Sequence, residues 1–412
     1  YNVVAGNWIG LDVTGDQPIG NIGDGVLIGF GSHANRVGTD GDGISDHLES
    51  NVISGNLSAG VMIIGANTSD NVISGNWIGT DARGLKAQGN NNWGIRIADG
   101  AHNNRIGTDA DGFHDLEERN VVSGNHQDGI RIEHTTSIAN RISGNYIGLD
   151  PSGTDGMGNR GNGILIYQSS QNIIGGSVPI SGNVISGNHG DGINVEGIDA
   201  VANEIQGNRI GTTANGLRPL ANFQNGIHVH GGAREVVIGT EGNGKDDSTE
   251  GNLVSGNARS GILITGANTT QVIVAGNLIG TDKDGTTSIG NHNHGILIQQ
   301  GVHAIRIGTD GDLFSDRIEG NLISGNYKNG IELTDAATTD NIVAGNQIGT
   351  DITGSTALSN ARSGLVLSNG TYGNRIGTDG NGTADQTERN VISSNLRDGI
   401  TIHGSGTREN SI

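Results

Sequence analysis

The sequence predicts an all-β protein built as a parallel β-solenoid, and three observations lead to this fold class. A hexamer that begins at Asn51, Asn-Val-Ile-Ser-Gly-Asn, returns with little change along the whole chain. Its apolar residues are β-branched and alternate with polar ones, which is the period of a strand. With 74 Gly and only 33% hydrophobic residues, the 412-residue chain cannot build one thick core. A narrow core that repeats along an axis remains.

The hexamers define a 69-residue repeat. The cleanest copies begin at Asn51, Asn120, Asn183, Asn252, Asn321 and Asn390, and only the step from Asn120 to Asn183 is shorter than the others. We expect one continuous β-helix over residues 1–412, made of a partial unit 1–50, the units 51–119, 120–182, 183–251, 252–320 and 321–389, and a partial unit 390–412.

Each unit contains the same short strands in the same order. In residues 51–119 a first hexamer is followed by an apolar segment at 60–65, a second hexamer at 71–76, and further apolar segments at 94–97 and 104–107. Strands this short cannot bury a face alone, but in a coil each lies about 4.8 Å from its counterpart in the next turn. We interpret each 69-residue unit as three coils, each a third of its length.

Residue type predicts a role at each position of the coil. Inward Ile and Val side chains form the core, each contributing about 1.5–3 kcal/mol when buried. The two Asn of each hexamer fall at strand ends, where their amides can form hydrogen-bonded ladders from turn to turn. Glycines such as Gly55 and Gly60 supply positive φ or close backbone approach at the corners.

An acidic loop in register from unit to unit is the strongest candidate for a metal site. Alternate Asp or Asn residues, usually a Gly, and a later Glu can together supply the oxygen ligands that Ca²⁺ prefers. The alternative is a solvated turn, in which these residues serve turn geometry and solubility. The unit 120–182 lacks the loop. The candidate calcium ligands are Asp40, Asp42, Asp46 and Glu49; Asp109, Asp111, Asp115 and Glu118; Glu241, Asn243, Asp247 and Glu250; Asp310, Asp312, Asp316 and Glu319; and Asp379, Asn381, Asp385 and Glu388.

The position after the second hexamer forms a column that is aromatic in three successive units. It holds Trp8, Trp77 and Tyr146, and then Arg209, Leu278 and Gln347. Aromatic rings in a row can stack on sugars, so the three aromatic residues are candidates for glycan contact. A ring that covers an exposed coil edge is the alternative.

Charge and composition exclude several classes of partner. The net charge of −20 argues against binding to nucleic acid or an anionic membrane and makes divalent cations plausible counter-ions. No apolar run approaches the eighteen residues of a membrane helix. The chain has no Cys and therefore no disulfide or thiolate metal ligand.

The pattern Asn-x-Ile-x-Gly-Asn followed by Gly-Ile-x-Ile resembles the parallel β-helix repeats of secreted and surface bacterial proteins. The string Ile-Gly-Thr-Asp-x-x-Gly is similar to that of very large repeat-rich bacterial surface proteins. The resemblance covers essentially the whole chain and implies a right-handed parallel β-helix in an extracellular or cell-surface setting. It implies no activity, because this fold carries enzymes, adhesins and fibre proteins alike.

The sequence favours a structural or adhesive role. No catalytic constellation stands out, and every carboxylate cluster is repeated, so we expect a stiff, acidic, calcium-binding rod that is not an enzyme. Filaments or a surface layer would form by end-to-end contact between copies, because neither end of the chain looks capped. Surface polysaccharide is the other expected partner. The alternative is a polysaccharide-active enzyme, such as a lyase, epimerase or hydrolase, or a glycan-binding module.

Overall fold

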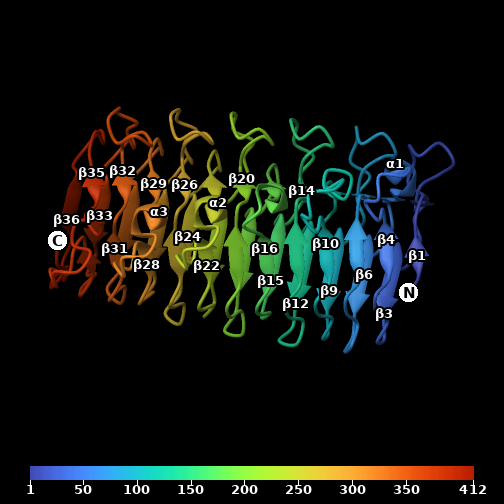
Figure 1. Ribbon diagram of the computed structural model, residues 1–412, viewed down its shortest axis with the longest axis horizontal. Coiled ribbons are helices and arrows are strands. Elements are labelled where there is room, and N and C mark those ends of the chain that lie inside the picture. The colour runs from blue at the N-terminus through green and yellow to red at the C-terminus, as the bar shows by residue number, and fades with distance from the viewer. The chain divides into compact units, whose positions relative to one another are not determined.

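The computed structural model describes residues 1–412, which divide into two compact units, Tyr1–Asn194 (unit 1) and Val195–Ile412 (unit 2). In both units the chain winds as a right-handed parallel β-helix, and about twelve turns follow one another along the sequence. Each turn contributes one strand to each of three parallel sheets, here called sheets 1, 2 and 3 (Figure 1). The predicted fold class is therefore confirmed. The prediction of a single continuous helix over residues 1–412 stays a prediction.

The strands are two to four residues long. In unit 1, sheet 1 contains β1 (Val3–Val4), β4 (Arg36–Gly38), β7 (Val72–Ser74), β10 (Arg105–Gly107), β13 (Arg141–Ser143) and β16 (Ile173–Gly175). Sheet 2 contains β2 (Trp8–Ile9), β5 (Val52–Ile53), β8 (Trp77–Ile78), β11 (Val121–Val122), β14 (Tyr146–Ile147) and β17 (Val184–Ile185). Sheet 3 contains β3 (Val26–Gly29), β6 (Val61–Ile64), β9 (Ile95–Ala98), β12 (Ile130–Glu133) and β15 (Ile164–Tyr167). Strand β18 (Ile193–Glu196) includes the boundary between the units.

Unit 2 repeats the arrangement. Its sheet 1 contains β19 (Glu204–Gln206), β22 (Val237–Gly239), β25 (Ile273–Ala275), β28 (Arg306–Gly308), β31 (Ile342–Ala344) and β34 (Arg375–Ile376). Sheet 2 contains β20 (Arg209–Ile210), β23 (Leu253–Val254), β26 (Leu278–Ile279), β29 (Leu322–Ile323), β32 (Gln347–Ile348) and β35 (Val391–Ile392). Sheet 3 contains β21 (Ile227–His230), β24 (Ile262–Thr265), β27 (Ile296–Gln299), β30 (Ile331–Thr334), β33 (Leu365–Ser368) and β36 (Ile400–His403).

The expectation of three coils in each repeat is wrong, because each repeat makes two turns. Arg36, Val72 and Arg105 lie side by side in successive turns of sheet 1, so two turns separate Arg36 from Arg105. Asn56 and Asn90, which are partners in adjacent turns, are 34 residues apart in the sequence. The two hexamers of a repeat belong to different sheets: the first contains β5 of sheet 2, and the second contains β7 of sheet 1. Because the same hexamer pattern occurs on two different sheets, the number of hexamers overestimates the number of turns.

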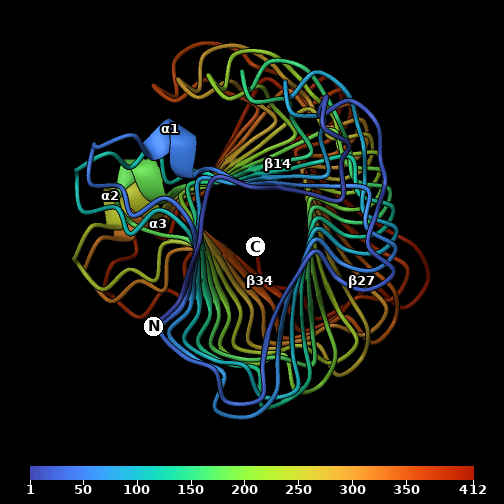
Figure 2. The ribbon, with the colours of Figure 1, turned by 90° about the vertical axis from the view of Figure 1, so that its right-hand side faces the viewer.

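The core is a set of aliphatic columns inside the coil. Ile95, Ile130 and Ile164 stack in register on sheet 3, and all three are fully buried. Figure 2 shows the three sides of a turn, with loops and the short helices outside the corners. The helices are α1 (Asp46–Glu49), α2 (Asp247–Glu250), α3 (Asp316–Glu319) and the 3₁₀ turn η1 (Pro179–Ser181). Helices α1, α2 and α3 each form the last turn of an acidic loop. Strand periodicity did not predict these helical turns.

Three ladders of asparagine line the corners, as predicted from the hexamer. Each amide Nδ2 donates to the Oδ1 of the next Asn at 2.8–3.3 Å. In unit 1 the ladders are Asn2, Asn35, Asn71, Asn104, Asn140 and Asn172; Asn7, Asn51, Asn76, Asn120, Asn145 and Asn183; and Asn21, Asn56, Asn90, Asn125, Asn159 and Asn188. The ladders satisfy amides that are shielded from water, where an unpaired polar group is costly.

The corner glycines also have their predicted roles. Gly55 has φ of 72°, the left-handed region that favours glycine. At Gly60 a Cβ atom would lie 2.6 Å from Ile78 Cγ2 and 2.7 Å from the carbonyl oxygen of Gly94, so the turns approach too closely for a side chain.

The first ladder is interrupted in unit 2. Val236, Val272 and Ile305 occupy three consecutive ladder positions, and all are buried. A ladder position therefore accepts an apolar residue when its neighbours are apolar too, because no amide is then left unpaired.

We predict that Asn104→Val costs about 1–3 kcal/mol of unfolding free energy, because the buried amide of Asn71 loses its acceptor. The triple change of Asn71, Asn104 and Asn140 to Val should cost less than three times the single change, since it reproduces the apolar block of unit 2. Urea unfolding of the three proteins measures this. If the triple variant lost three times the unfolding free energy that the single variant loses, the idea that neighbouring apolar residues compensate for one another would be wrong.

Candidate functional site

A groove of about 460 Å³ lies over sheet 2 of unit 1. Its floor consists of Trp8, Val52, Trp77 and Val121, which lie in register on β2, β5, β8 and β11. The outward position of the strand thus alternates between a large aromatic and a small aliphatic residue. Trp8 and Trp77 are two strand spacings apart, roughly 9–10 Å.

Tyr146 continues this column one strand beyond the floor of the groove. It lies in register with Val121, and the guanidinium of Arg119 stacks over its ring at 4.1 Å. The structure therefore brings the three predicted aromatic residues into one line of unit 1. In unit 2 the same column holds Arg209, Leu278 and Gln347.

The walls of the groove come from two families of loops. One wall is formed by acidic loops, with Asp46 and His47 from α1 and Glu117 and Arg119 from the next loop; the other is formed by Ala82 and Pro151. Gly84 lets this second wall close on the floor. Its φ is +66°, and a Cβ there would lie 2.3 Å from Pro151 Cγ and 3.3 Å from the indole of Trp77.

Acidic and imidazole side chains lie in and beside the groove. Asp46 is buried and committed to structure, because its carboxylate accepts hydrogen bonds from the Thr39 hydroxyl at 2.8 Å and the Gly43 amide at 3.1 Å. His114 Nδ1 lies 3.7 Å from Asp46 and 3.9 Å from Glu117. Glu117 and His47 are exposed and line the groove, so they remain accessible to a bound molecule.

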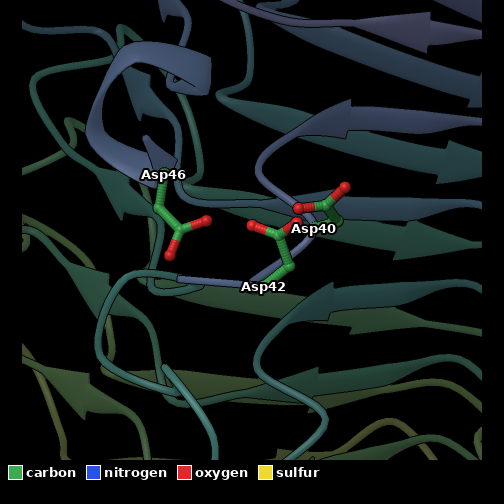
Figure 3. Close-up of side chains that lie close together, drawn as sticks. All are labelled: Asp40, Asp42 and Asp46. Atoms are coloured by element: carbon green, nitrogen blue, oxygen red, sulfur yellow. The ribbon is translucent and has the colours of Figure 1, made fainter. Parts of the chain in front are cut away.

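The acidic loops share one internal geometry. In the first loop, Asp40, Asp42 and Asp46 turn their carboxylates toward one small space (Figure 3). In the second, the Thr108 hydroxyl donates to Asp115 at 2.5 Å, and the Asp109 amide donates to Glu118 at 3.0 Å. The same two bonds recur at residues 309 and 310, so the loop is built by its own carboxylates.

Four acidic loops also contain an arginine that sequence reasoning missed. Arg105 Nη1 donates to Glu118 Oε1 at 3.0 Å, although Glu118 is only 2% exposed. The equivalent pairs are Arg36 with Asp40 and Glu49, Arg306 with Glu319 at 2.6 Å, and Arg375 with Glu388 at 2.7 Å. The string Arg-x-Gly-Thr-Asp, with the arginine on sheet 1, was the available signal.

Burial raises the pKa of Glu118 above its ordinary value of 4.5, and the charge of Arg105 opposes that shift. Burial likewise raises the pKa of Glu319, and the charge of Arg306 opposes that shift. The guanidinium therefore serves as the internal counter-charge of a carboxylate that is costly to bury.

Many of the predicted metal ligands do converge. Oxygen atoms of three carboxylates lie within 4.8 Å of one another in four clusters that could hold a metal ion: Asp40, Asp42 and Asp46; Asp109, Asp115 and Glu118; Asp310, Asp316 and Glu319; and Asp379, Asp385 and Glu388. Other predicted ligands have local roles: the side-chain oxygens of Asp111, Asp312, Asn243 and Asn381 each accept the amide two residues later. Calcium itself stays a prediction.

Comparisons with known proteins found similar solved structures but no related sequence. No protein-family model matches the chain, and no curated protein sequence matches it. A variant of the periplasmic alginate epimerase AlgG is 13% identical with a TM-score of 0.47, covering 86% of this chain and 72% of that one. The A-module of the Azotobacter vinelandii mannuronan C-5 epimerase AlgE4 is 13% identical with a TM-score of 0.40, covering 92% and 90%. The Dettilon tailspike protein is 16% identical with a TM-score of 0.38, covering 89% and 66%.

The three parallel sheets of the chain itself make it a parallel β-helix repeat protein. No helix in the structure has the length and apolar character needed to cross a bilayer.

The expectation of a structural or adhesive rod that is not an enzyme is corrected at this point. The similar structures named above include two epimerases, and the alternative, a polysaccharide-active or glycan-binding protein, fits these findings better. The repetition of every carboxylate cluster predicts a structural rather than a catalytic role. The aromatic column of unit 1 is nevertheless not repeated, because the equivalent positions of unit 2 hold Arg209, Leu278 and Gln347.

We predict that Arg105→Gln lowers the unfolding free energy by about 2–3 kcal/mol near neutral pH, because a buried carboxylate loses its partner. The pKa of Glu118 is raised in the folded state, so ionised Glu118 opposes folding and stability is regained as the pH falls through that pKa. Without Arg105 the pKa rises further, and the difference between variant and parent should shrink at acid pH.

Arg141→Gln is the matched control for this prediction. Arg141 is the neighbour of Arg105 on sheet 1, but its Nε donates to the Ser143 hydroxyl at 2.9 Å. Urea unfolding at neutral and acid pH should show only a small, pH-independent loss for it. An equal pH dependence in both variants would show that Arg105 does not act through Glu118.

Proposed function

We propose that unit 1 binds a polysaccharide in the groove over sheet 2 and acts on it there by acid–base chemistry. The observation that carries this proposal is the repeated aromatic floor, Trp8 and Trp77, in one groove with the accessible side chains of Glu117, His47 and Arg119. Binding sites combine apolar and aromatic surface with a few polar groups that fix orientation, and this groove has both.

The spacing of the floor supports a chain-like ligand. Two strand spacings, roughly 9–10 Å, are close to the length of two sugar rings in an extended glycan. A polysaccharide lying across the strands would therefore place every second ring over an indole, with the intervening ring over Val52 or Val121. Indole faces provide large, rigid contact surfaces for the apolar faces of sugar rings.

The walls of the groove supply the reacting groups. Hydrolysis of a glycosidic bond requires a proton donor and a carboxylate or base, and elimination or epimerisation requires removal of a ring proton. We assign these roles to Glu117 and His47, which are the accessible carboxylate and imidazole of the groove. Arg119 is positioned over Tyr146 and can bind an acidic group of the sugar.

We further propose that the protein works outside the cytoplasm, at the cell surface or in the extracellular medium. Long glycans that could fill an open groove occur there. The net charge of −20 and the lack of any Cys are compatible with that setting.

We predict that Trp77→Ala weakens glycan binding about tenfold or more, since it removes one of the two indole rings of the floor. The measurement is affinity electrophoresis or calorimetry against a panel of neutral and acidic polysaccharides. Trp93→Ala is the matched control, because Trp93 lies outside the groove, where Arg96 stacks on its ring at 4.9 Å. Equal losses in both variants would count against the groove.

Turnover is tested separately with Glu117→Gln. We predict that the variant retains binding but releases sugar products or converts stereocentres at least about a hundredfold more slowly, as expected for loss of an acid–base group. The control is Glu409→Gln, an exposed carboxylate of unit 2 beside Arg408. Undiminished turnover in Glu117→Gln would refute its assigned role.

A further inference from the structure

A column of positive charge runs along unit 2, in the turns that lead into sheet 3. Five successive turns place the same position in register, because the backbone amide of each residue donates to the carbonyl oxygen of the residue one turn earlier at 3.0–3.1 Å; the column is Arg259, Asn293, Lys328, Arg362 and Arg397. Turns repeat at about 4.8 Å, so the column spans roughly 19 Å. Its four cations, Arg259, Lys328, Arg362 and Arg397, are here called the basic stripe.

The fold does not require cations at this position. In unit 1 the same column holds Asn92, Gln127 and Gly161 in three successive turns, and none of them is charged. The whole chain carries a net charge of −20, so a run of cations stands out against its acidic surroundings. The basic stripe is therefore a deviation from the repeat.

The basic stripe has no acidic partner. Elsewhere in unit 2, Arg306 and Arg375 each pair with a loop carboxylate, at 2.6 Å and 2.7 Å, whereas no carboxylate pairs with any cation of the stripe. Three of these four side chains are exposed, and that of Lys328 is half-buried. They are thus accessible to a ligand from solution.

The acidic residues beside the basic stripe are engaged by other groups. Glu332 accepts a hydrogen bond from Asn329 Nδ2 at 2.7 Å. Asp398, which follows Arg397, accepts the Thr401 hydroxyl at 3.1 Å. The protein itself therefore leaves the charge of the stripe largely uncompensated.

The stacked cations repel one another. Like charges directly opposite on adjacent strands are destabilising, and Lys328 and Arg362 lie in adjacent turns. Their field also reaches His294: burial lowers the pKa of this imidazole, the two charges add to the shift, and the pKa falls from 6.5 to about 4. A bound polyanion would remove this repulsion.

An aromatic ring lies beside the cations. Tyr327, which directly precedes Lys328, is 60% exposed, and the ring of His292 meets it edge to face at 4.9 Å between centroids. A tyrosine combines an apolar ring with a polar hydroxyl, a combination that suits contact with a sugar ring. The surface therefore offers both charge and stacking area.

We propose that the basic stripe binds an acidic polysaccharide that carries one carboxylate on each sugar ring. One cation per turn, at about 4.8 Å, matches one charge per ring of an extended glycan, whereas duplex DNA has a phosphate about every 3.4 Å along each strand. The net charge of −20 also opposes the approach of a polyphosphate. This site lies in unit 2, so it is additional to the groove of unit 1 and does not depend on turnover there.

The direct test is calorimetric titration of the full chain with a linear hexamer of galacturonate. We expect binding that weakens at high NaCl, because salt screens exposed charges. The double change Lys328→Gln and Arg362→Gln should weaken binding about tenfold or more. This variant removes a repulsion, so its own melting temperature should not fall.

The matched control is the double change Arg317→Gln and Arg389→Gln, which alters the net charge equally at exposed residues of unit 2 outside the stripe. It should bind the hexamer as the parent does. The hexamer should also raise the melting temperature of the parent and the control, but not that of the stripe variant.

Three results would each overturn the inference: no hexamer binding by the parent, equal losses in the two double variants, or equal or tighter binding of a single-stranded oligonucleotide of the same length. Trp77→Ala distinguishes the stripe from the groove of unit 1. This variant should retain the binding that depends on Lys328 and Arg362. Complete loss of hexamer binding in Trp77→Ala would place the ligand in the groove instead.

Discussion

The structure depends on register: each turn of the coil must lie on the next with like residues in contact. This constraint makes an isolated change costly, because a buried amide in one turn is the partner of the amide in the next. The asparagine ladders and the Ile columns are two results of the same stacking. Val236, Val272 and Ile305 lie next to one another in successive turns. Because all three are apolar and buried, no amide among them is left without a partner.

A repeated frame can still produce a unique site. The loops and strands that form the groove recur along the chain, but their outward residues vary independently of the core. Trp8 and Trp77 face outward on sheet 2 of unit 1, while Leu278 and Gln347 occupy the same column in unit 2. Likewise, Val237 replaces an arginine without disturbing β22. Function in such a fold lies in deviations from the repeat.

Much of the fold could be predicted from the hexamers, including the strand type, the Asn ladders and the glycine corners at Gly55 and Gly60. The number of turns could not, because the hexamers at Asn51 and Asn71 look alike although they lie on different sheets. The acidic loops were found, but their arginines were not. Arg105 and Glu118 are 13 residues apart along the chain, and only the folded loop brings their side chains to 3.0 Å.

The sequence by itself determined the all-β solenoid, the in-register acidic loops and the aromatic column of Trp8, Trp77 and Tyr146, because all three follow from local periodicity. The tertiary structure decided which loops face one another. It placed Glu117 and His47 in the groove above the indoles. It also left Asp247 Oδ1, in the loop that follows β22, without a hydrogen-bond partner. These relations depend on contacts between turns, and the periodicity of one strand contains no information about which side chains meet across them.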